Sequence, residues 1–244
     1  MPGYIFFSDQ KEMDAPIYRI FGVERLFQLF DVQKLALVKP SAWDDPFENF
    51  ILKSKARLEN GELAEFAYAN DLYGQCWSFK EESDAMWRIY SANQYGVKVK
   101  TTPRKLREAL AGSVPYSDIS AFIGKVRYHT DAQLRGMLND RARMQRKVFD
   151  GAGQGLAETL LFKRTAFEHE QEVRLIYSKN DGRESQDIFL FPFDPFSNIE
   201  EVVFDPRMDN RLVEIYSNHI RSLGFKGKIQ KSTLYEIPNL EVQV

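Results

Sequence analysis

The chain has 244 residues, 43% of them hydrophobic, which is enough to fill the core of one large domain. Its 33 lysines and arginines nearly balance its 35 acidic residues, and the net charge of -2 argues against a general nucleic-acid-binding protein. Cys76 is the only cysteine, so an internal disulfide and a zinc site of several cysteines are excluded.

The longest apolar runs fall well short of the roughly 20 residues that a membrane span needs. The amino terminus also lacks the basic region and apolar core of a signal peptide. We therefore expect a cytoplasmic protein without a membrane partner.

In the first half of the chain, hydrophobic spacing predicts strands separated by helices. Ser83 has the character of an amino-terminal cap, and a helix follows it through Tyr90. A loop with an Asp-Pro turn covers residues 43 to 50. The predicted strands are residues 17 to 21, 35 to 38, 74 to 79 and 95 to 100, and the other predicted helices are 23 to 30 and 51 to 72.

The second half opens with a helix of about ten residues that begins at Pro103, which suits a first helical turn. Two alternating segments, 170 to 177 and 187 to 193, are joined by a short polar link and predict an antiparallel hairpin. The remaining predictions are strands at 123 to 128, 199 to 204 and 227 to 237, and helical segments at 130 to 162 and 209 to 223.

This mixed order of strands and helices contains no repeat or linker. It predicts one α+β domain over residues 1 to 244, rather than a regular alternation of parallel strands and helices.

Charged side chains alternate along the predicted strand that begins at Glu170. Glu170, Glu172 and Arg174 are two residues apart, so in a strand they share one face. Two carboxylates about 7 Å apart with a cation beyond them can divide chemical work. The same alternation is typical of a solvated, self-neutralising row of charges on a sheet, and the spacing alone favours that simpler interpretation.

Two earlier strands carry further polar candidates. Arg19 follows Tyr18 among apolar residues, and an arginine near packed surface can bind a phosphate with two hydrogen bonds. Ser78 lies on a predicted central strand, where a hydroxyl can position a carboxylate or a sugar. An exposed arginine and a small buried serine are the structural alternatives.

Aromatic residues are distributed among these polar positions. A wall of rings beside a charged face suits a planar ligand such as a nicotinamide or a base, although most such rings belong to a core. Asp44, Asp45 and Glu48 could bind a cation, but Asp-Asp-Pro favours a turn, and we expect no metal. The rings are Trp43, Trp77, Trp87, Tyr90 and Phe167.

Several of these segments together resemble a bacterial and phage family known only as a domain of unknown function. Its hallmarks are a loop ending in Asn-Asp-Pro-Phe-Glu, a Met-Trp-x-x-Tyr helix and a late Glu-x-Glu-Trp-Arg strand. This chain has Asp44 in place of the asparagine and Val173 in place of the tryptophan, which leaves the bonding of the loop open. The matching segments are Tyr18-Arg19, 40 to 48, 76 to 79, Met86-Trp87 with Tyr90, Gly96-Val97, and Lys163 with 167 to 174.

A second likeness concerns function. An arginine on the first strand, a serine on a middle strand and a Glu-x-Glu on a late strand are similar to the arginine-serine-glutamate layout of ADP-ribosyltransferases. That layout implies a split, largely antiparallel mixed sheet flanked by helices. It also implies NAD as substrate and a macromolecular acceptor, either protein or nucleic acid.

The same layout implies a role for each residue. Arg19 would hold the NAD phosphates, Ser78 would orient Glu172, and Glu172 would bind the nicotinamide ribose and stabilise its oxocarbenium-like transition state. Glu170 would help to activate the acceptor, which Phe167 would contact. The other residues assigned to NAD are Tyr18, Trp87, Tyr90 and Arg174.

The resulting prediction is an ADP-ribosyltransferase-like effector of a toxin or antiphage system, with a neutralising partner. One alternative is a noncatalytic module of a defence system that binds a ligand or nucleic acid. Another is a metal-dependent nuclease that uses Asp45 or Glu48 with Glu170, Glu172 and Lys163.

Overall fold

The computed structural model describes residues 4–43, 56–57, 62–64, 71–148, 150, 153–179 and 186–237. These residues form two compact units. Unit 1 comprises residues 1–17, 34–80 and 102–193, and unit 2 comprises residues 18–33, 81–101 and 194–244. Both units combine helices with strands, which confirms the α+β class, while the assignment of residues 1 to 244 to one domain stays a prediction. No helix in the described part of the chain is both long and apolar enough to cross a membrane.

The sheet of unit 1 is built around β11, whose seven residues are all buried. β11 runs antiparallel to both β6 and β8, β3 pairs antiparallel with β6 and β12, and β1 pairs parallel with β8. The sheet is therefore mixed and largely antiparallel, as predicted. Its strands are β1 (Ile5–Phe6), β3 (Lys34–Val38), β6 (Leu72–Ser78), β8 (Ala121–Lys125), β11 (Glu172–Ser178) and β12 (Ile188–Pro192).

The predicted hairpin between residues 170 to 177 and 187 to 193 is wrong, because β12 pairs with β3. Both edges of β11 are already occupied, one by β6 and the other by β8, so β12 has no free edge of β11 to join. The strand also begins at Glu172 rather than at Glu170. Gln171 has a left-handed backbone with φ 46° and separates Glu170 from the strand.

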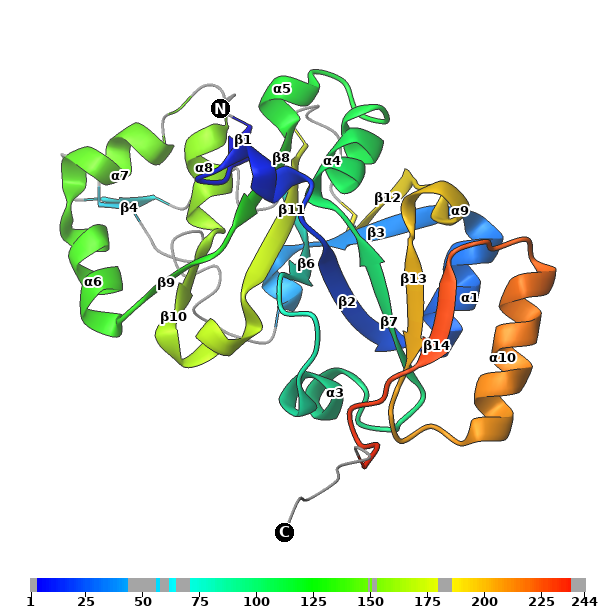
Figure 1. Ribbon diagram of the computed structural model, residues 1–244. Coiled ribbons are helices and arrows are strands. Elements are labelled where there is room, and N and C mark those ends of the chain that lie inside the picture. The colour runs from blue at the N-terminus through cyan, green and yellow to red at the C-terminus, as the bar shows by residue number, and fades with distance from the viewer. Residues whose placement is uncertain are drawn as a thin grey trace, which may run out of the picture. The chain divides into compact units, whose positions relative to one another are not determined.

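Helices pack on the sheet of unit 1. α4 (Pro103–Ala111) contacts β8 and β11, with Leu106 and Leu110 fully buried. α8 (Gln154–Thr159) also packs on β8 and β11 (Figure 1). Its Leu156 and Ala157 join a core with Phe122 and Ile176.

The helical segments predicted for the outer part of unit 1 agree only in part with the structure. The helical prediction for residues 130 to 162 is confirmed over three short helices, whereas the helix predicted for 51 to 72 is wrong at β4 (Ala56–Arg57) and β5 (Leu63–Ala64). The rest of that segment before Asp71, except residue 62, lies outside the described residues. The outer elements are η1 (Gln10–Met13), η2 (Pro40–Ala42), α5 (Ser117–Ser120), β9 (Arg127–His129), α6 (Asp131–Asn139), α7 (Arg141–Val148), β10 (Phe162–Arg164) and η4 (Thr165–Glu170).

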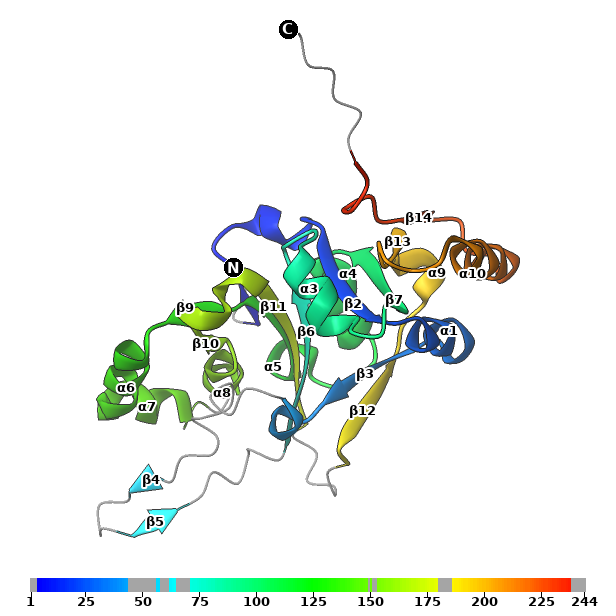
Figure 2. The same ribbon diagram turned by 90° about the horizontal axis from the view of Figure 1, so that it is seen from below.

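Unit 2 has its own strands, in the order β2, β7, β13 and β14. β13 runs antiparallel to β7 and parallel to β14. α1 lies against β7 and α10 against β14 (Figure 2). The elements are β2 (Ile17–Gly22), α1 (Val23–Val32), α3 (Asp84–Tyr90), β7 (Gly96–Thr101), α9 (Pro195–Asn198), β13 (Glu201–Phe204), α10 (Asn210–Ser222) and β14 (Lys228–Lys231).

Two predictions in unit 2 concern the ends of elements, namely the start of α3 and the end of the last strand. Ser83 caps α3 as predicted, because its Oγ accepts a hydrogen bond from the Met86 N–H. The final strand is shorter than the predicted 227 to 237, since β14 ends at Lys231.

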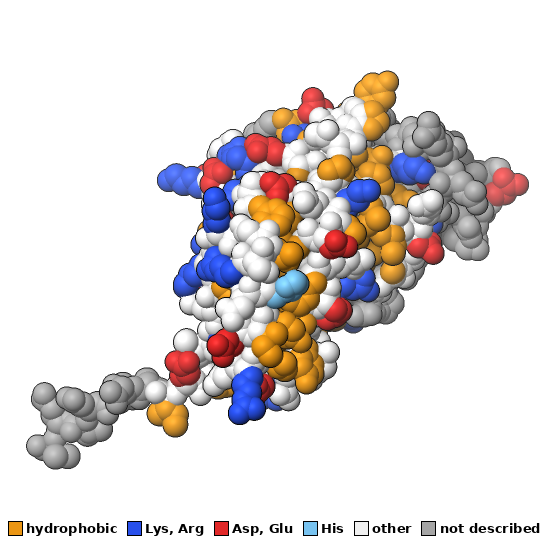
Figure 3. Space-filling model, turned by 90° about the vertical axis from the view of Figure 1, so that its right-hand side faces the viewer, with side chains coloured by type: hydrophobic (Ala, Val, Ile, Leu, Met, Phe, Trp, Pro, Cys, Tyr) orange, Lys and Arg blue, Asp and Glu red, His pale blue; other side chains and the backbone are white. Residues whose placement is uncertain are grey.

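The molecular surface in Figure 3 carries basic and acidic side chains interspersed with hydrophobic ones. Among the described residues on this face, neither charge sign forms a broad area of its own. That mixture agrees with the near-balanced composition of the whole chain.

Candidate functional site

Four charged side chains of unit 1 meet where the chain passes from β10 through η4 into β11. Lys163 is the middle residue of β10, Glu170 is the last residue of η4, and Glu172 and Arg174 are the first and third residues of β11. Only the six residues of η4 and Gln171 connect β10 to β11, so residues close in sequence face one another.

Lys163 bridges the two glutamates. Its Nζ donates to Glu170 Oε2 at 2.6 Å and to Glu172 Oε1 at 2.9 Å. The two carboxylates therefore share one ammonium group. Such charge-assisted bonds are the strong class of hydrogen bond in proteins.

Arg174 holds the other oxygen of Glu172. Its Nε and Nη2 lie 2.9 Å and 2.7 Å from Glu172 Oε2, and its Nη1 donates to the Leu160 carbonyl at 2.6 Å. The guanidinium carbon lies 4.5 Å from the ring centre of Trp43. Gly74 allows this ring to approach, because a Cβ at Gly74 would come within 2.5 Å of it.

This cluster is buried, with exposed fractions of 4% for Lys163, 6% for Glu170, 5% for Glu172 and none for Arg174. The interpretation as a solvated row of charges is therefore wrong. A buried charge is stable only when it is paired and hydrogen-bonded, and Lys163 and Arg174 provide that pairing.

The two carboxylates have different acidities. Burial raises the pKa of Glu170 to about 7, and the neighbouring Glu172 adds to this effect. Burial also acts to raise the pKa of Glu172, but Arg174 and Lys163 outweigh it and hold that pKa well below 4.5. At neutral pH, Glu172 is therefore ionised, whereas Glu170 is present in both its protonated and its ionised form.

Ser78 is directly opposite Glu172 in the pairing of β6 with β11. Its hydroxyl does not bond the Glu172 carboxylate: it donates to the Glu170 carbonyl at 2.5 Å and accepts from the Lys80 N–H at 2.8 Å. The prediction that Ser78 orients Glu172 directly is therefore wrong. Ser78 instead fixes the backbone of Glu170.

Phe167 lies on η4 and is half-buried. The centre of its ring is 4.6 Å from Lys163 Nζ, so the ring borders the cluster. Its predicted contact with an acceptor stays a prediction.

Tyr128, on β9, is a residue of the site that the sequence interpretation missed. Its hydroxyl oxygen accepts the Glu172 N–H at 2.8 Å, and Tyr128 pairs in register with Lys163. Burial raises the pKa of Tyr128 above its ordinary value of 10, so the hydroxyl keeps its proton. The predicted strand at 123 to 128 contained this tyrosine, but its pattern gave no signal of a partner on β11.

We expect Tyr128→Phe to lower the free energy of unfolding by about 1–3 kcal/mol, because the Glu172 N–H would lose its acceptor. Urea denaturation measures this difference. Tyr116→Phe is the matched control, since Tyr116 is 81% exposed and should change stability by less than about 0.5 kcal/mol. Equal effects of the two substitutions would contradict the assigned role of Tyr128.

The other residues assigned to NAD, apart from Arg174, belong to unit 2. Tyr18 is buried, whereas Arg19 is half-buried with its guanidinium carbon 5.7 Å from the Phe21 ring centre. Tyr90 is 43% exposed at the end of α3. Their convergence with Ser78 and Glu172 stays a prediction.

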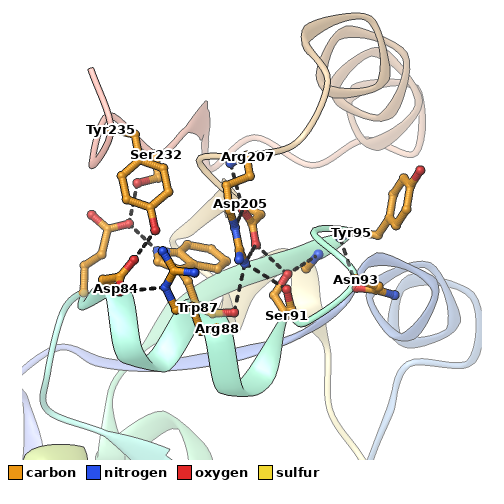
Figure 4. Close-up of polar contacts among 12 residues, drawn as sticks. Asp84, Trp87, Arg88, Ser91, Asn93, Tyr95, Asp205, Arg207, Ser232 and Tyr235 are labelled. Atoms are coloured by element: carbon orange, nitrogen blue, oxygen red, sulfur yellow. Dashed lines mark hydrogen bonds and ion pairs between the residues drawn. The ribbon is translucent and has the colours of Figure 1, made fainter. Parts of the chain in front are cut away.

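Trp87 has no exposed surface, and its Nε1 donates to Glu82 Oε1 at 2.8 Å (Figure 4). Ser232 donates to the same oxygen at 2.5 Å. Trp87 is therefore a core residue of unit 2, and a ligand would reach it only after a rearrangement.

A second ion pair, between the buried Asp205 and the partly exposed Arg207, lies beside α3 and was not predicted. Asp205 has no exposed surface, and its Oδ2 accepts from Arg207 Nη2 at 2.7 Å and from Ser91 Oγ at 2.6 Å (Figure 4). Arg207 Nη2 also donates to the carbonyls of Trp87 and Ser91. This pair connects the loop after β13 to the end of α3.

Among the residues that the structure describes, no three His, Cys, Asp or Glu side chains are grouped so that they could hold a metal ion. Asp44, Asp45 and Glu48, which the nuclease interpretation requires in part, lie outside the described residues.

Comparison with a family model described as "Protein of unknown function (DUF2971)" gives a match over residues 86–175. The resemblance to a family of unknown function is confirmed over this segment, which contains Trp87, Lys163 and the residues from Glu170 to Arg174. The individual motifs stay predictions. No curated protein matches the chain.

Solved structures of DarT from Thermus sp. 2.9 are also similar to the chain. The complexes with NAD+ and with ADP-ribosylated ssDNA share 13% identity with it, at a TM-score of 0.41. The complex with carba-NAD+ has the same identity and a TM-score of 0.40. The alignments cover 90% of this chain and 94% to 96% of the DarT chains.

Proposed function

We propose that this protein is an NAD-dependent ADP-ribosyltransferase-like effector that transfers ADP-ribose to a macromolecular acceptor. The observation that carries the proposal is a pair of buried glutamates on one ammonium with pKa values pushed in opposite directions. Two carboxyl groups whose pKa values differ in this way commonly divide electrostatic and acid-base roles.

The ionised carboxylate suits the bond-breaking step. When the bond between the ribose C1′ and the nicotinamide nitrogen breaks, nicotinamide leaves with the electron pair and positive charge develops on the ribose. Glu172 is the permanent anion that would stabilise this charge, and a preformed charge in a dry site is effective because it needs no reorganisation.

The second carboxyl suits the transfer step. A nucleophilic group of the acceptor forms the new bond to C1′, and its proton must go to a base. Glu170 has a pKa of about 7 and would accept this proton at neutral pH. In this proposal, Arg19, Tyr18 and Tyr90 contribute to NAD binding and Phe167 to acceptor binding. The fully buried Arg174 and Trp87 contribute only indirectly, Arg174 by holding Glu172.

The test is incubation with NAD labelled in its adenine moiety, with and without cell lysate. We expect release of nicotinamide and transfer of label to a macromolecule. Glu172→Gln should reduce turnover by about a hundredfold or more. Glu168→Gln is the matched control, because Glu168 is an exposed glutamate of the same η4 segment and should retain activity.

Treatment of the labelled product with nuclease or protease identifies the acceptor as nucleic acid or protein. The proposal is overturned if the folded wild-type protein releases no nicotinamide with any lysate. Metal-dependent cleavage of nucleic acid would then favour the nuclease, and nucleotide binding without turnover the noncatalytic module. Toxicity on expression that Glu172→Gln relieves would support a toxin with a neutralising partner.

A further inference from the structure

Lys163 lies between two buried carboxylates of unit 1, and no step above uses it. It is 4% exposed and bonds both Glu170 and Glu172. A single cation between two buried carboxylates influences which of them keeps a proton.

The Glu172 carboxylate can accept only a limited number of hydrogen bonds, and most of these positions are occupied. A carboxylate has about four lone-pair sites. Two are taken by the Nε and Nη2 of Arg174 and a third by Lys163 Nζ. Glu170 bonds the same Lys163 ammonium as Glu172, so a protonated Glu170 carboxyl can donate to Glu172 and compete for the remaining site.

We propose that Lys163 is a positioning residue of the transferase, whose ammonium favours the ionised form of Glu170 beside Glu172 and so leaves one acceptor site on Glu172 for a ribose hydroxyl of NAD. This inference rests on the proposed function. The ionised form of Glu170 is then the active form for two reasons. It accepts the proton of the acceptor, and it leaves the acceptor site on Glu172 open for the ribose.

Removal of the cation has a defined consequence. In Lys163→Met, Glu170 loses the hydrogen bond and the attraction that lower its pKa, while burial and Glu172 still raise it. Glu172 retains Arg174 and stays ionised. We expect the acid limb of the pH profile of NAD turnover to move upward by about one to three pH units.

The experiment combines this profile with a direct titration. The carboxyl carbon of Glu170 is followed by NMR in protein labelled with 13C-glutamate, with the signal assigned by its absence in Glu170→Gln. The titration midpoint and the acid limb should both move upward in Lys163→Met. Lys163→Arg retains a cation, so its titration midpoint and acid limb should lie much closer to those of the wild-type protein.

If Lys163→Met does not fold, Lys163→Arg alone gives the test, with a smaller upward shift expected. An unmoved Glu170 midpoint, or activity reduced equally at every pH, overturns the role of Lys163. Absence of NAD turnover by the wild-type protein, despite a shifted midpoint in the variant, overturns the proposed function itself. The NMR readout therefore separates the two failures.

Discussion

Arg174→Met is expected to lower the free energy of unfolding by about 3–5 kcal/mol, the usual cost of removing one partner of a buried ion pair. Arg174 has no exposed surface, and its guanidinium bonds Glu172 Oε2 and the Leu160 carbonyl. Methionine fills a similar volume but satisfies neither acceptor. Urea denaturation followed by circular dichroism measures the loss.

The matched control is Arg104→Met. Arg104 bonds Asp14 at 2.7 Å and 2.9 Å, but both side chains are substantially exposed, so the expected loss is below about 1 kcal/mol. The double variant Glu172→Gln/Arg174→Met should be destabilised by less than the sum of the two single variants, because it removes both charges of the pair. Additive effects would show that Glu172 and Arg174 are not coupled.

The sequence pattern predicted the charged members of this cluster but not their environment. Alternation identified Glu172 and Arg174 as neighbours on one face of a strand, and the structure confirms that arrangement by their hydrogen bond. Burial could not be predicted, because it depends on how α8 packs on β11 and on Trp43, which is distant in sequence, covering Arg174. Alternation reports the period of a strand, not what covers it.

Strand pairing shows the same limit. The two segments at 170 to 177 and 187 to 193 were correctly predicted as strands over most of their length. Their proximity in sequence favoured a hairpin, but both edges of β11 are taken by β6 and β8. Pairing is decided by competition among all strands of a sheet, which local spacing does not contain.

Tyr128 and Ser78 illustrate why individual contacts were harder to predict than elements. Both were on segments predicted as strands, yet each bonds a backbone group, Tyr128 the Glu172 N–H and Ser78 the Glu170 carbonyl. Such bonds depend on the register between strands and on the left-handed turn at Gln171. Neither feature has a side-chain signature in the sequence.

Asp205→Asn is expected to lower the free energy of unfolding by about 1–3 kcal/mol at neutral pH, because the partly exposed Arg207 would lose its buried anionic partner. Asp205 accepts bonds from Arg207 and Ser91 and is fully buried. The matched control is Asp84→Asn in the same unit. Asp84 bonds Arg88 and Tyr235 at the surface, where an ion pair contributes little to stability.

The cost of Asp205→Asn should also depend on pH in a defined direction. Burial acts to raise the pKa of Asp205, but the hydrogen bonds from Arg207 and Ser91 outweigh it and place the pKa below the ordinary 3.8. A carboxyl with a lowered pKa in the folded state contributes its stability above its unfolded pKa and loses it as the pH falls through the folded value. Urea denaturation at several pH values should therefore show a constant gap between wild type and Asp205→Asn above about pH 5, narrowing below about pH 4. A gap that stays constant into acid would mean that Asp205 stabilises unit 2 through packing rather than through its charge.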